Sequence, residues 1–184
     1  MGRMPSKIIS ELLIFMKLNP KEIKALKQHL NNKENRRNSV LDLLYKKLKV
    51  DNNIALYIDG ASDLHSKTAG IGGVIYSSNN EIFSFSEYLH DATNNEAEYN
   101  ALIMGLKSLL KLKLLNPIIY SDSELIVKQV NGEYRVKNDR MKLLHKEVIG
   151  LLSNFENWSL IHVLRDKNKV ADKLANEGRK KVNY

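Results

Sequence analysis

The sequence predicts a single α/β domain, in which a five-stranded mixed sheet is flanked by helices, with a small helical appendage in front of it. The chain has 184 residues, and about 150 residues usually support one well-buried core. Beyond residue 51, short apolar segments with strand character alternate with longer segments of helical periodicity. Such alternation is typical of a sheet covered by helices. We therefore expect an appendage at 1–50 and the main domain at 51–184.

Residues 1–50 are expected to form three short amphipathic helices. Apolar residues recur at helical spacing after each of three residues that commonly begin a helix, namely Ser6, Pro20 and Ser39. A polar loop at 31–38 separates the second helix from the third. Three such helices fit a small bundle, a dimerisation hairpin or a DNA-binding unit, and their spacing does not choose among these.

The main domain begins with three strands joined by short, turn-rich links, which favour an antiparallel meander. We expect these strands at 54–58, 70–77 and 81–89. A long helix follows at 94–115, and a short apolar strand of the kind buried inside a sheet follows at 117–120. The remainder is predicted as helix, helix, strand and helix, at 123–130, 139–152, 158–164 and 168–179.

The positive charge of the chain is concentrated in the appendage. The formal net charge is +8, and residues 1–50 hold 12 basic and four acidic groups, so the main domain is formally neutral. A basic segment of this kind could meet a polyanion such as nucleic acid. The alternative is a solvated helical surface in a chain rich in lysine and asparagine.

The composition excludes several kinds of site. The sequence contains no cysteine, which rules out disulfides, a cysteine nucleophile and zinc bound by thiolates. The apolar run at 12–16 is bounded by charged residues and is too short for a signal-peptide core or a membrane span. We therefore expect a cytoplasmic protein with no membrane partner, whose chemistry depends on carboxylates, histidines and hydroxyls.

Four carboxylates are the candidate catalytic residues. Asp59 and Asp122 each follow an apolar strand, Glu98 lies one turn into its helix among apolar neighbours, and Asp172 lies near the start of the last helix. Either strand-end aspartate alone could be a helix cap, but two at parallel positions of one sheet favour a site. Converging acids raise one another's pKa unless a cation joins them. Oxygen ligands favour Mg²⁺ or Mn²⁺, and two such ions about 4 Å apart are known to support phosphodiester cleavage.

Four segments of the chain resemble the motifs of ribonuclease H type 1, in the order of that family and over residues 54–178. They are Tyr57-Ile58-Asp59-Gly60-Ala61-Ser62, Thr93-Asn94-Asn95-Glu96-Ala97-Glu98-Tyr99, Tyr120-Ser121-Asp122-Ser123 and Asn168-Lys169-Val170-Ala171-Asp172-Lys173-Leu174-Ala175. The resemblance implies the ribonuclease H fold and metal-dependent endonucleolytic cleavage of the RNA strand of RNA/DNA hybrids. It also implies that two Mg²⁺ ions, for which Mn²⁺ can substitute, give 5′-phosphate and 3′-hydroxyl products. The implied metal ligands are Asp59, Glu98, Asp122 and Asp172.

The resemblance also assigns residues that contact substrate. Hydroxyl and amide donors at a helix N-terminus suit phosphates and sugar hydroxyls, although they could equally cap that helix. The implied substrate-binding residues are Gly60, Ser62, Thr93, Asn94, Asn95 and Asn168. Arg165 stands where better-known relatives have a mobile histidine, as in a short-loop subgroup, and we expect it to act as a cation near the scissile phosphate or product. His162 is a weaker candidate, more typical of a structural histidine at a strand end.

The chain departs from the family at two places. The loop at 63–67 lacks the glycine, proline and asparagine of many relatives, and Asp63 adds a negative charge near the expected path of the phosphate backbone. The basic protrusion of some relatives is absent, since 131–138 connects two helices directly, and Trp158, the only tryptophan, is expected in the core. We therefore expect the extension at 1–50 to supply nucleic-acid affinity, or else to mediate oligomerisation.

Two alternative functions of the main domain are also consistent with the sequence. The domain could bind hybrid or double-stranded RNA without cleaving it, although four assembled acids argue against a pure binder. Cleavage could also extend to RNA/RNA duplexes, because both kinds of duplex are recognised largely by shape and 2′-hydroxyl groups.

Overall fold

The computed structural model describes residues 20–32, 34–36, 41–42, 54–63 and 65–181. The chain divides into two compact units, 1–51 and 52–184. In the first unit the helix α2 spans Pro20–Asn31, so it begins at the proline that the sequence indicated, and the short 3₁₀ helix η1 spans Glu34–Arg36. The helix predicted to begin at Ser6, and nearly all of the one predicted after Ser39, lie outside the described residues.

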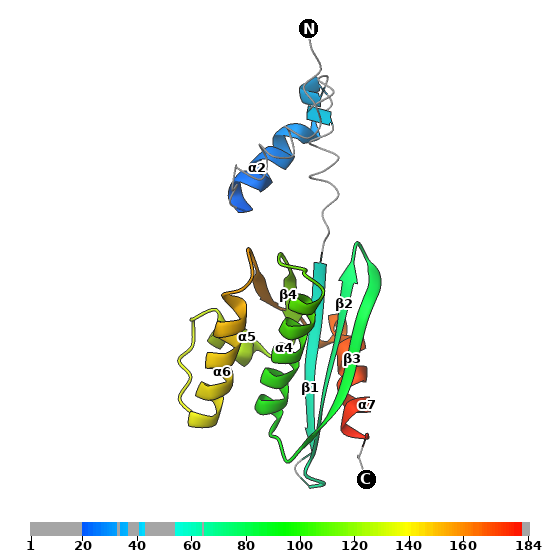
Figure 1. The fold of residues 1–184 in the computed structure, drawn as a ribbon, viewed down its shortest axis with the longest axis vertical. Coiled ribbons are helices and arrows are strands. Elements are labelled where there is room, and N and C mark those ends of the chain that lie inside the picture. Colours follow the sequence, from blue (N-terminus) through cyan, green and yellow to red (C-terminus); the bar gives the residue numbers. More distant parts are fainter. Residues whose placement is uncertain (1–19, 33, 37–40, 43–53, 64, 182–184) are drawn as a thin grey trace. The chain divides into compact units, whose positions relative to one another are not determined.

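The second unit is built on a five-stranded mixed sheet with the strand order β3-β2-β1-β4-β5 (Figure 1). The first three strands form the expected antiparallel meander, while β4 pairs parallel to β1, and β5 parallel to β4. The strands are β1 Ile54–Asp63, β2 Thr68–Ser77, β3 Asn80–His90, β4 Ile118–Ser121 and β5 Ser159–His162. This order places β1 and β4, the two strands that carry candidate acids, side by side.

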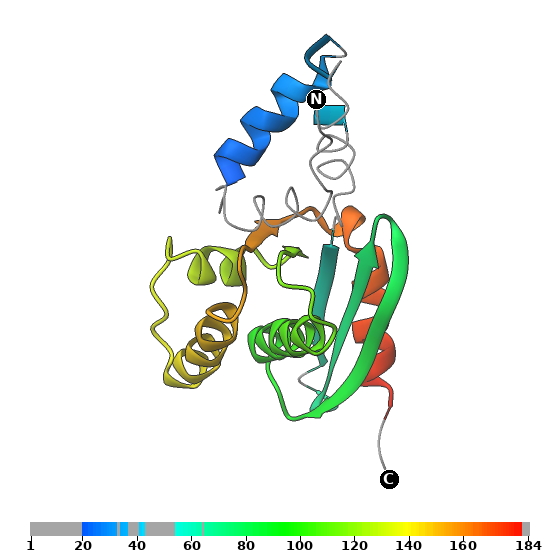
Figure 2. The same ribbon diagram turned by 45° about the horizontal axis from the view of Figure 1, so that its top comes forward.

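Helices cover both faces of this sheet (Figures 1 and 2). The helix α4 packs on β1 and β2 from one face and against α6, whereas α7 packs on β1, β2 and β3 from the other. The helices are α4 Asn94–Lys111, α5 Glu124–Val130, α6 Asp139–Leu152, α7 Lys169–Arg179 and the short 3₁₀ helix η2 Arg165–Lys167. None of the helices in the described part of the chain has the length and apolar character that a membrane crossing requires.

The core lies between α4 and the sheet. Leu56 and Ile58 of β1 are fully buried there with Leu102 and Leu106 of α4 and Ile119 of β4. Burying a side chain of this size contributes about 1.5–3 kcal/mol, so this layer fixes α4 against the paired strands β1 and β4. The candidate acids on these elements are thereby held on a rigid base.

The strand β1 is longer than predicted, and this changes the setting of Asp59. The sequence indicated a strand that ends at Ile58, but pairing of β1 with β2 continues to Asp63 opposite Thr68. Pairing of β1 with β4 does stop at Ile58, opposite Ser121. Asp59 therefore lies inside a strand and at the end of the β1–β4 ladder, where the edge of the shorter strand leaves room for a site.

Two other local predictions are wrong. The helix predicted to reach residue 115 ends at Lys111, and the chain then turns through Lys113, which has a φ of 59°. Trp158 precedes β5 and is 37% exposed, so it is not a core residue. Both predictions rested on neighbouring apolar residues. The strand β5 is only four residues long, and Trp158 lies outside it and is not buried.

The close packing of α7 on the sheet depends on glycine in β2. A Cβ atom at Gly72 would lie 2.2 Å from the backbone nitrogen of Ala175, so Gly72→Ala must push the helix from the sheet. We expect this change to lower the free energy of unfolding by about 3 kcal/mol, as overpacking of a core does. Gly150 in α6 is the matched control, because a Cβ there meets nothing within 4 Å, and Gly150→Ala should stabilise the helix slightly. Urea denaturation of both variants measures the difference, and equal midpoints would contradict it.

Candidate active site

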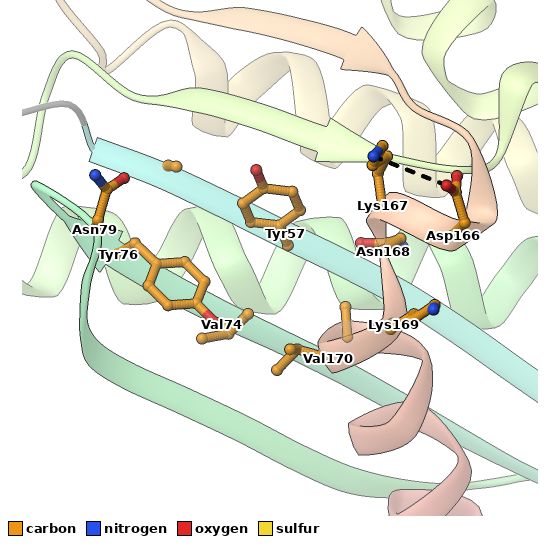
Figure 3. Close-up of a pocket in the computed structure, with 11 residues that line it drawn as sticks. Tyr57, Val74, Tyr76, Asn79, Asp166, Lys167, Asn168, Lys169 and Val170 are labelled. Atoms are coloured by element: carbon orange, nitrogen blue, oxygen red, sulfur yellow. Dashed lines mark ion pairs between the residues drawn. The ribbon is translucent and has the colours of Figure 1, made fainter.

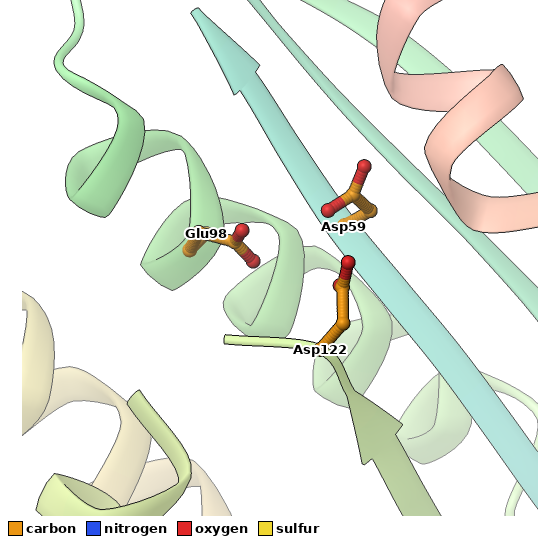
Figure 4. Close-up of side chains that lie close together, drawn as sticks. All are labelled: Asp59, Glu98 and Asp122. Atoms are coloured by element: carbon orange, nitrogen blue, oxygen red, sulfur yellow. The ribbon is translucent and has the colours of Figure 1, made fainter. Parts of the chain in front are cut away.

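Three of the predicted acids converge at the point where β1 and β4 separate. Asp59 comes from β1, Glu98 from α4 and Asp122 from the residue directly after β4, and their side chains point toward one another (Figure 4). Each offers a carboxylate oxygen, and these oxygens all lie within 4.8 Å of one another. Three oxygens at this spacing could be ligands of a shared cation.

Local packing explains how Glu98 reaches the two aspartates. A Cβ at Gly60 would lie 2.3 Å from the backbone nitrogen of Glu98, so only glycine lets this turn of α4 approach β1. The backbone N–H of Gly60 also donates a hydrogen bond to the Glu98 carboxylate. The predicted substrate-binding Gly60 therefore has a structural role at this close approach.

The electrostatics of this acidic cluster (Asp59, Glu98 and Asp122) favour the binding of a cation. Burial, followed by the charges of Asp122 and Asp172, raises the pKa of Asp59 to about 8. Burial, followed by the charges of Asp59 and Asp122, raises the pKa of Glu98 to about 9. Glu98 is only 4% exposed, and its Oε2 atom has no hydrogen-bond partner. A divalent cation would supply the missing partner and favour the ionised carboxylates, so these residues fit a metal.

The fourth predicted acid, Asp172, lies beside the cluster but outside it. It lines the same cavity of about 430 Å³, and its charge contributes to the raised pKa of Asp59. Nη2 of Arg165 donates to Oδ1 of Asp172 at 2.5 Å, and this ion pair raises the pKa of the mostly exposed Arg165. Arg165 thus lines the same cavity as the acids and is held there by Asp172.

Asn168 corrects a prediction. The resemblance to the family implied that Asn168 binds substrate, but it is only 1% exposed. Its Nδ2 donates to Oδ1 of Asp122 at 2.7 Å and to the backbone oxygen of Ile58 at 2.9 Å. Asn168 therefore links the start of α7 to β1 and fixes one oxygen of Asp122, so that it positions a candidate metal ligand.

The other predicted substrate-binding residues divide into two groups. Ser62 and Asn94 line the cavity with the acids, whereas Thr93 and Asn95 are not among its lining residues. Thr93 caps α4, because its Oγ1 accepts from the backbone nitrogen of Glu96 at 3.3 Å and donates to the Glu96 carboxylate at 2.8 Å. The capping role, which was the alternative explanation, thus occupies the Thr93 hydroxyl in this structure.

Three polar residues that line the cavity were not predicted from the sequence: Ser123, Asn176 and Arg179. Asn176 and Arg179 follow Asp172 by four and seven residues in α7, which is the spacing of one helix face. That spacing was a usable signal once Asp172 had been identified as a site residue.

A second cavity, of about 320 Å³, lies between the start of α7 and strands β1 and β2 (Figure 3). Its walls include Tyr57 and Tyr76, whose rings meet edge to face, and Lys167, which pairs with Asp166 at 3.9 Å. None of the acids of the cluster lines it. The arrangement that can hold a cation is therefore in the first cavity.

A mixed sheet of this strand order, covered by helices and carrying acids where its central parallel strands separate, defines a ribonuclease H-like domain. The chain belongs to the family described as reverse transcriptase-like, whose profile matches residues 57–178. The resemblance to ribonuclease H type 1 and the expected fold class are both confirmed.

Relatives with known names support this classification. A protein of Halobacterium salinarum named Ribonuclease HI is 34% identical over 122 residues, which are 66% of this chain and 61% of that protein. The "Bifunctional protein Rv2228c" of Mycobacterium tuberculosis is 32% identical over 126 residues, 67% of this chain and 35% of that protein. The crystal structure of LC11-RNase H1 in complex with RNA/DNA hybrid is 36% identical with a TM-score of 0.66, and the match covers 70% of this chain and 98% of that one.

The matches are partial in the two curated relatives. The chain spans 61% of the length of the Halobacterium protein and 35% of the Mycobacterium protein. The family profile, at residues 57–178, includes the acidic cluster.

Proposed function

We propose that the chain is a ribonuclease H, an endonuclease that hydrolyses the RNA strand of RNA/DNA hybrids. The observation that carries this proposal is the convergence of Asp59, Glu98 and Asp122 within 4.8 Å. A relative named Ribonuclease HI and a related RNase H1 structure in complex with RNA/DNA hybrid support the same activity. We further place the protein in the cytoplasm.

The proposed cofactor is Mg²⁺, as two ions per site, with Mn²⁺ able to substitute. Asp59, Glu98 and Asp122 would hold the metal, and Asp172 would join them from α7. When bound, the metal lowers the pKa of the attacking water and stabilises charge on the departing 3′ oxygen, so that the products carry a 5′-phosphate and a 3′-hydroxyl. An all-oxygen ligand set supports a hard divalent cation.

The remaining side chains of the cavity bind and orient the substrate. Ser62 and Asn94 offer a hydroxyl and an amide where the duplex would pass, and both groups suit phosphate and sugar oxygens. Arg165 is 77% exposed at its side chain and tied to Asp172. It can therefore exchange this partner for the scissile phosphate or the product without a change in the backbone.

Cleavage of labelled duplexes tests the proposed activity. RNA/DNA, RNA/RNA and DNA/DNA duplexes of one sequence are incubated with the full chain and Mg²⁺, Mn²⁺ or a chelator. We expect internal cuts in the RNA of the hybrid, with either metal and not with the chelator, and the RNA/RNA duplex reports whether double-stranded RNA is also a substrate. Binding of the hybrid without cleavage under both metals would identify a binding module instead.

Asn168→Ala tests the link between α7 and Asp122. The change removes the hydrogen bond to Oδ1 of Asp122, and loss of such an outer partner typically costs about 10–100-fold in metal affinity or activity. We expect the Mg²⁺ concentration for half-maximal cleavage to rise by at least about tenfold. Asn100→Ala is the control, because it removes only a bond to the backbone oxygen of Glu96 and Asn100 does not line the acidic cavity. An unchanged Mg²⁺ requirement would show that Asn168 does not position the ligand.

Residues 1–50 are proposed to add nucleic-acid affinity to a formally neutral domain. Their 12 basic groups outnumber four acidic ones, and basic groups that meet phosphates make binding salt-dependent. We expect a chain that begins at residue 51 to show a higher KM for the hybrid, a flatter salt dependence of KM and an unchanged kcat. An unchanged salt dependence, with a change in sedimentation, would assign the extension to oligomerisation.

A further inference from the structure

The last turn of α7 places an arginine in the acidic cavity. Asp172, Asn176 and Arg179 all line this cavity from one face of the helix. At 1.5 Å per residue, Arg179 starts about 10 Å along the helix axis from Asp172. Its guanidinium lies in the wall of this cavity near the end of β1, where it meets Asp63.

A specific partner fixes the direction of this arginine. Nη1 of Arg179 lies 3.1 Å from Oδ2 of Asp63 at the end of β1. Asp63 is itself held, because its Oδ1 accepts from the backbone nitrogens of His65 at 3.0 Å and Ser66 at 3.4 Å. These hydrogen bonds and Arg179 lower the pKa of Asp63. Asp63 therefore stays ionised at neutral pH and orients the guanidinium.

This ion pair changes the interpretation of the altered loop at 63–67. From the sequence, Asp63 was expected to place an additional negative charge near the phosphate backbone. The structure pairs that charge with Arg179, so the charges of these two residues offset each other. The departure of the loop from the family pattern thus coincides with a cation on the facing helix.

Arg179 also has donor capacity to spare. A guanidinium has five N–H donors, the ion pair with Asp63 engages Nη1, and the side chain is still 25% exposed. The other cation that lines the cavity, Arg165, is held by Asp172 at 2.5 Å. Arg179 is therefore the lining cation whose partner lies away from the candidate metal ligands.

We propose that Arg179 is a substrate-binding residue, which contacts a backbone phosphate about three nucleotides from the cleaved bond, and that Asp63 is its positioning residue. Successive phosphates of one strand are about 3.4 Å apart along the duplex axis, so the offset of about 10 Å between Asp172 and Arg179 along α7 corresponds to a flanking phosphate rather than the scissile one. A planar guanidinium suits phosphate geometry. This inference rests on the proposed cleavage of hybrids.

Arg179→Gln in the full chain tests the proposal by steady-state kinetics at several salt concentrations. We expect KM for the hybrid to rise about tenfold with kcat unchanged within about twofold, and the slope of log KM against log salt to fall by about one phosphate contact. Arg179→Lys should keep the salt slope while restoring only part of the affinity, since it retains the charge and loses the planar fork. Lys180→Gln removes the same charge from the next residue, which is exposed and does not line the cavity, and it should behave as the unchanged chain.

A scan of the substrate identifies the phosphate without altering the protein. Hybrids in which single phosphates are replaced by uncharged methylphosphonates should reveal a flanking position at which the unchanged chain loses affinity and the Arg179→Gln variant does not. The inference is wrong if the unchanged chain cleaves the hybrid but Arg179→Gln changes neither KM, nor the salt slope, nor the loss of affinity at any methylphosphonate position. In that case the proposed function still stands. If the unchanged chain does not cleave the hybrid, the proposed function itself fails.

Discussion

Asp122→Asn is expected to lower kcat for hybrid cleavage by at least about a thousandfold, while hybrid binding changes only a few-fold. The substitution keeps the shape of the side chain and removes the charge of one of three carboxylates that meet within 4.8 Å. Binding survives because most of the affinity for a duplex comes from phosphate contacts outside the metal site. Single-turnover cleavage and a filter-binding assay with the same hybrid separate the two effects.

Asp139→Asn provides the matched control for this loss. Asp139 is an exposed acid in the first turn of α6, where it pairs with Lys142 at 2.7 Å. It does not line the acidic cavity, so its loss should leave kcat unchanged. If Asp122→Asn retained the kcat of the unchanged chain, the proposed metal site would be misplaced.

The second large effect is on stability without metal, which should fall as the pH rises. In the unfolded chain aspartate and glutamate titrate near pH 4, whereas in the folded chain the pKa of Asp59 is about 8 and that of Glu98 about 9. Between these values the folded state binds more protons than the unfolded state. The two acids therefore make their full stabilising contribution to the free energy of unfolding below about pH 4. This contribution is lost as the pH rises toward 8 and 9.

Thermal unfolding with a chelator, at pH 5.5, 7 and 8.5, measures this dependence. Each pKa unit corresponds to about 1.4 kcal/mol, and about 1 kcal/mol shifts Tm by a few degrees in a chain of this size, so we expect the chelated protein to lose several degrees over this range. Asp59→Asn should have a higher Tm at pH 8.5 and a flatter pH dependence, since one buried charge is gone. Saturating Mg²⁺ should remove most of the pH dependence in the unchanged chain. Equal pH slopes for the unchanged chain and Asp59→Asn would show that the cluster does not carry this linkage.

The fold and the acids could be predicted because they leave local signals in the sequence. Apolar runs and helical periodicity indicated each strand and helix of residues 54–179, and Asp59 and Asp122 each follow an apolar run. The length of β1 was not predicted, because it is set by the partner strand. The strand β1 extends to Asp63 because β2 continues to pair with it, and no pattern within β1 itself indicates this.

The roles of Asn168 and Arg179 could not be predicted, because each depends on residues far away along the chain. Asn168 bonds to Asp122 and to Ile58, which are 46 and 110 residues earlier. Arg179 pairs with Asp63 of β1, which is 116 residues earlier. A motif gives the residue type at such positions, but the fold decides whether the side chain faces the substrate or supports a neighbour.

The measurement that tests the central claim most directly is single-turnover cleavage of a hybrid with one phosphorothioate at the cleaved bond. Each stereoisomer is compared with the unmodified hybrid in Mg²⁺ and in Mn²⁺, because Mn²⁺ tolerates sulfur as a ligand better than Mg²⁺ does. If the acidic cluster holds a metal that acts on the scissile phosphate, one stereoisomer should be cleaved at least about tenfold more slowly in Mg²⁺ and should recover in Mn²⁺. Equal rates of the modified and unmodified hybrids in both metals would contradict a metal at that phosphate.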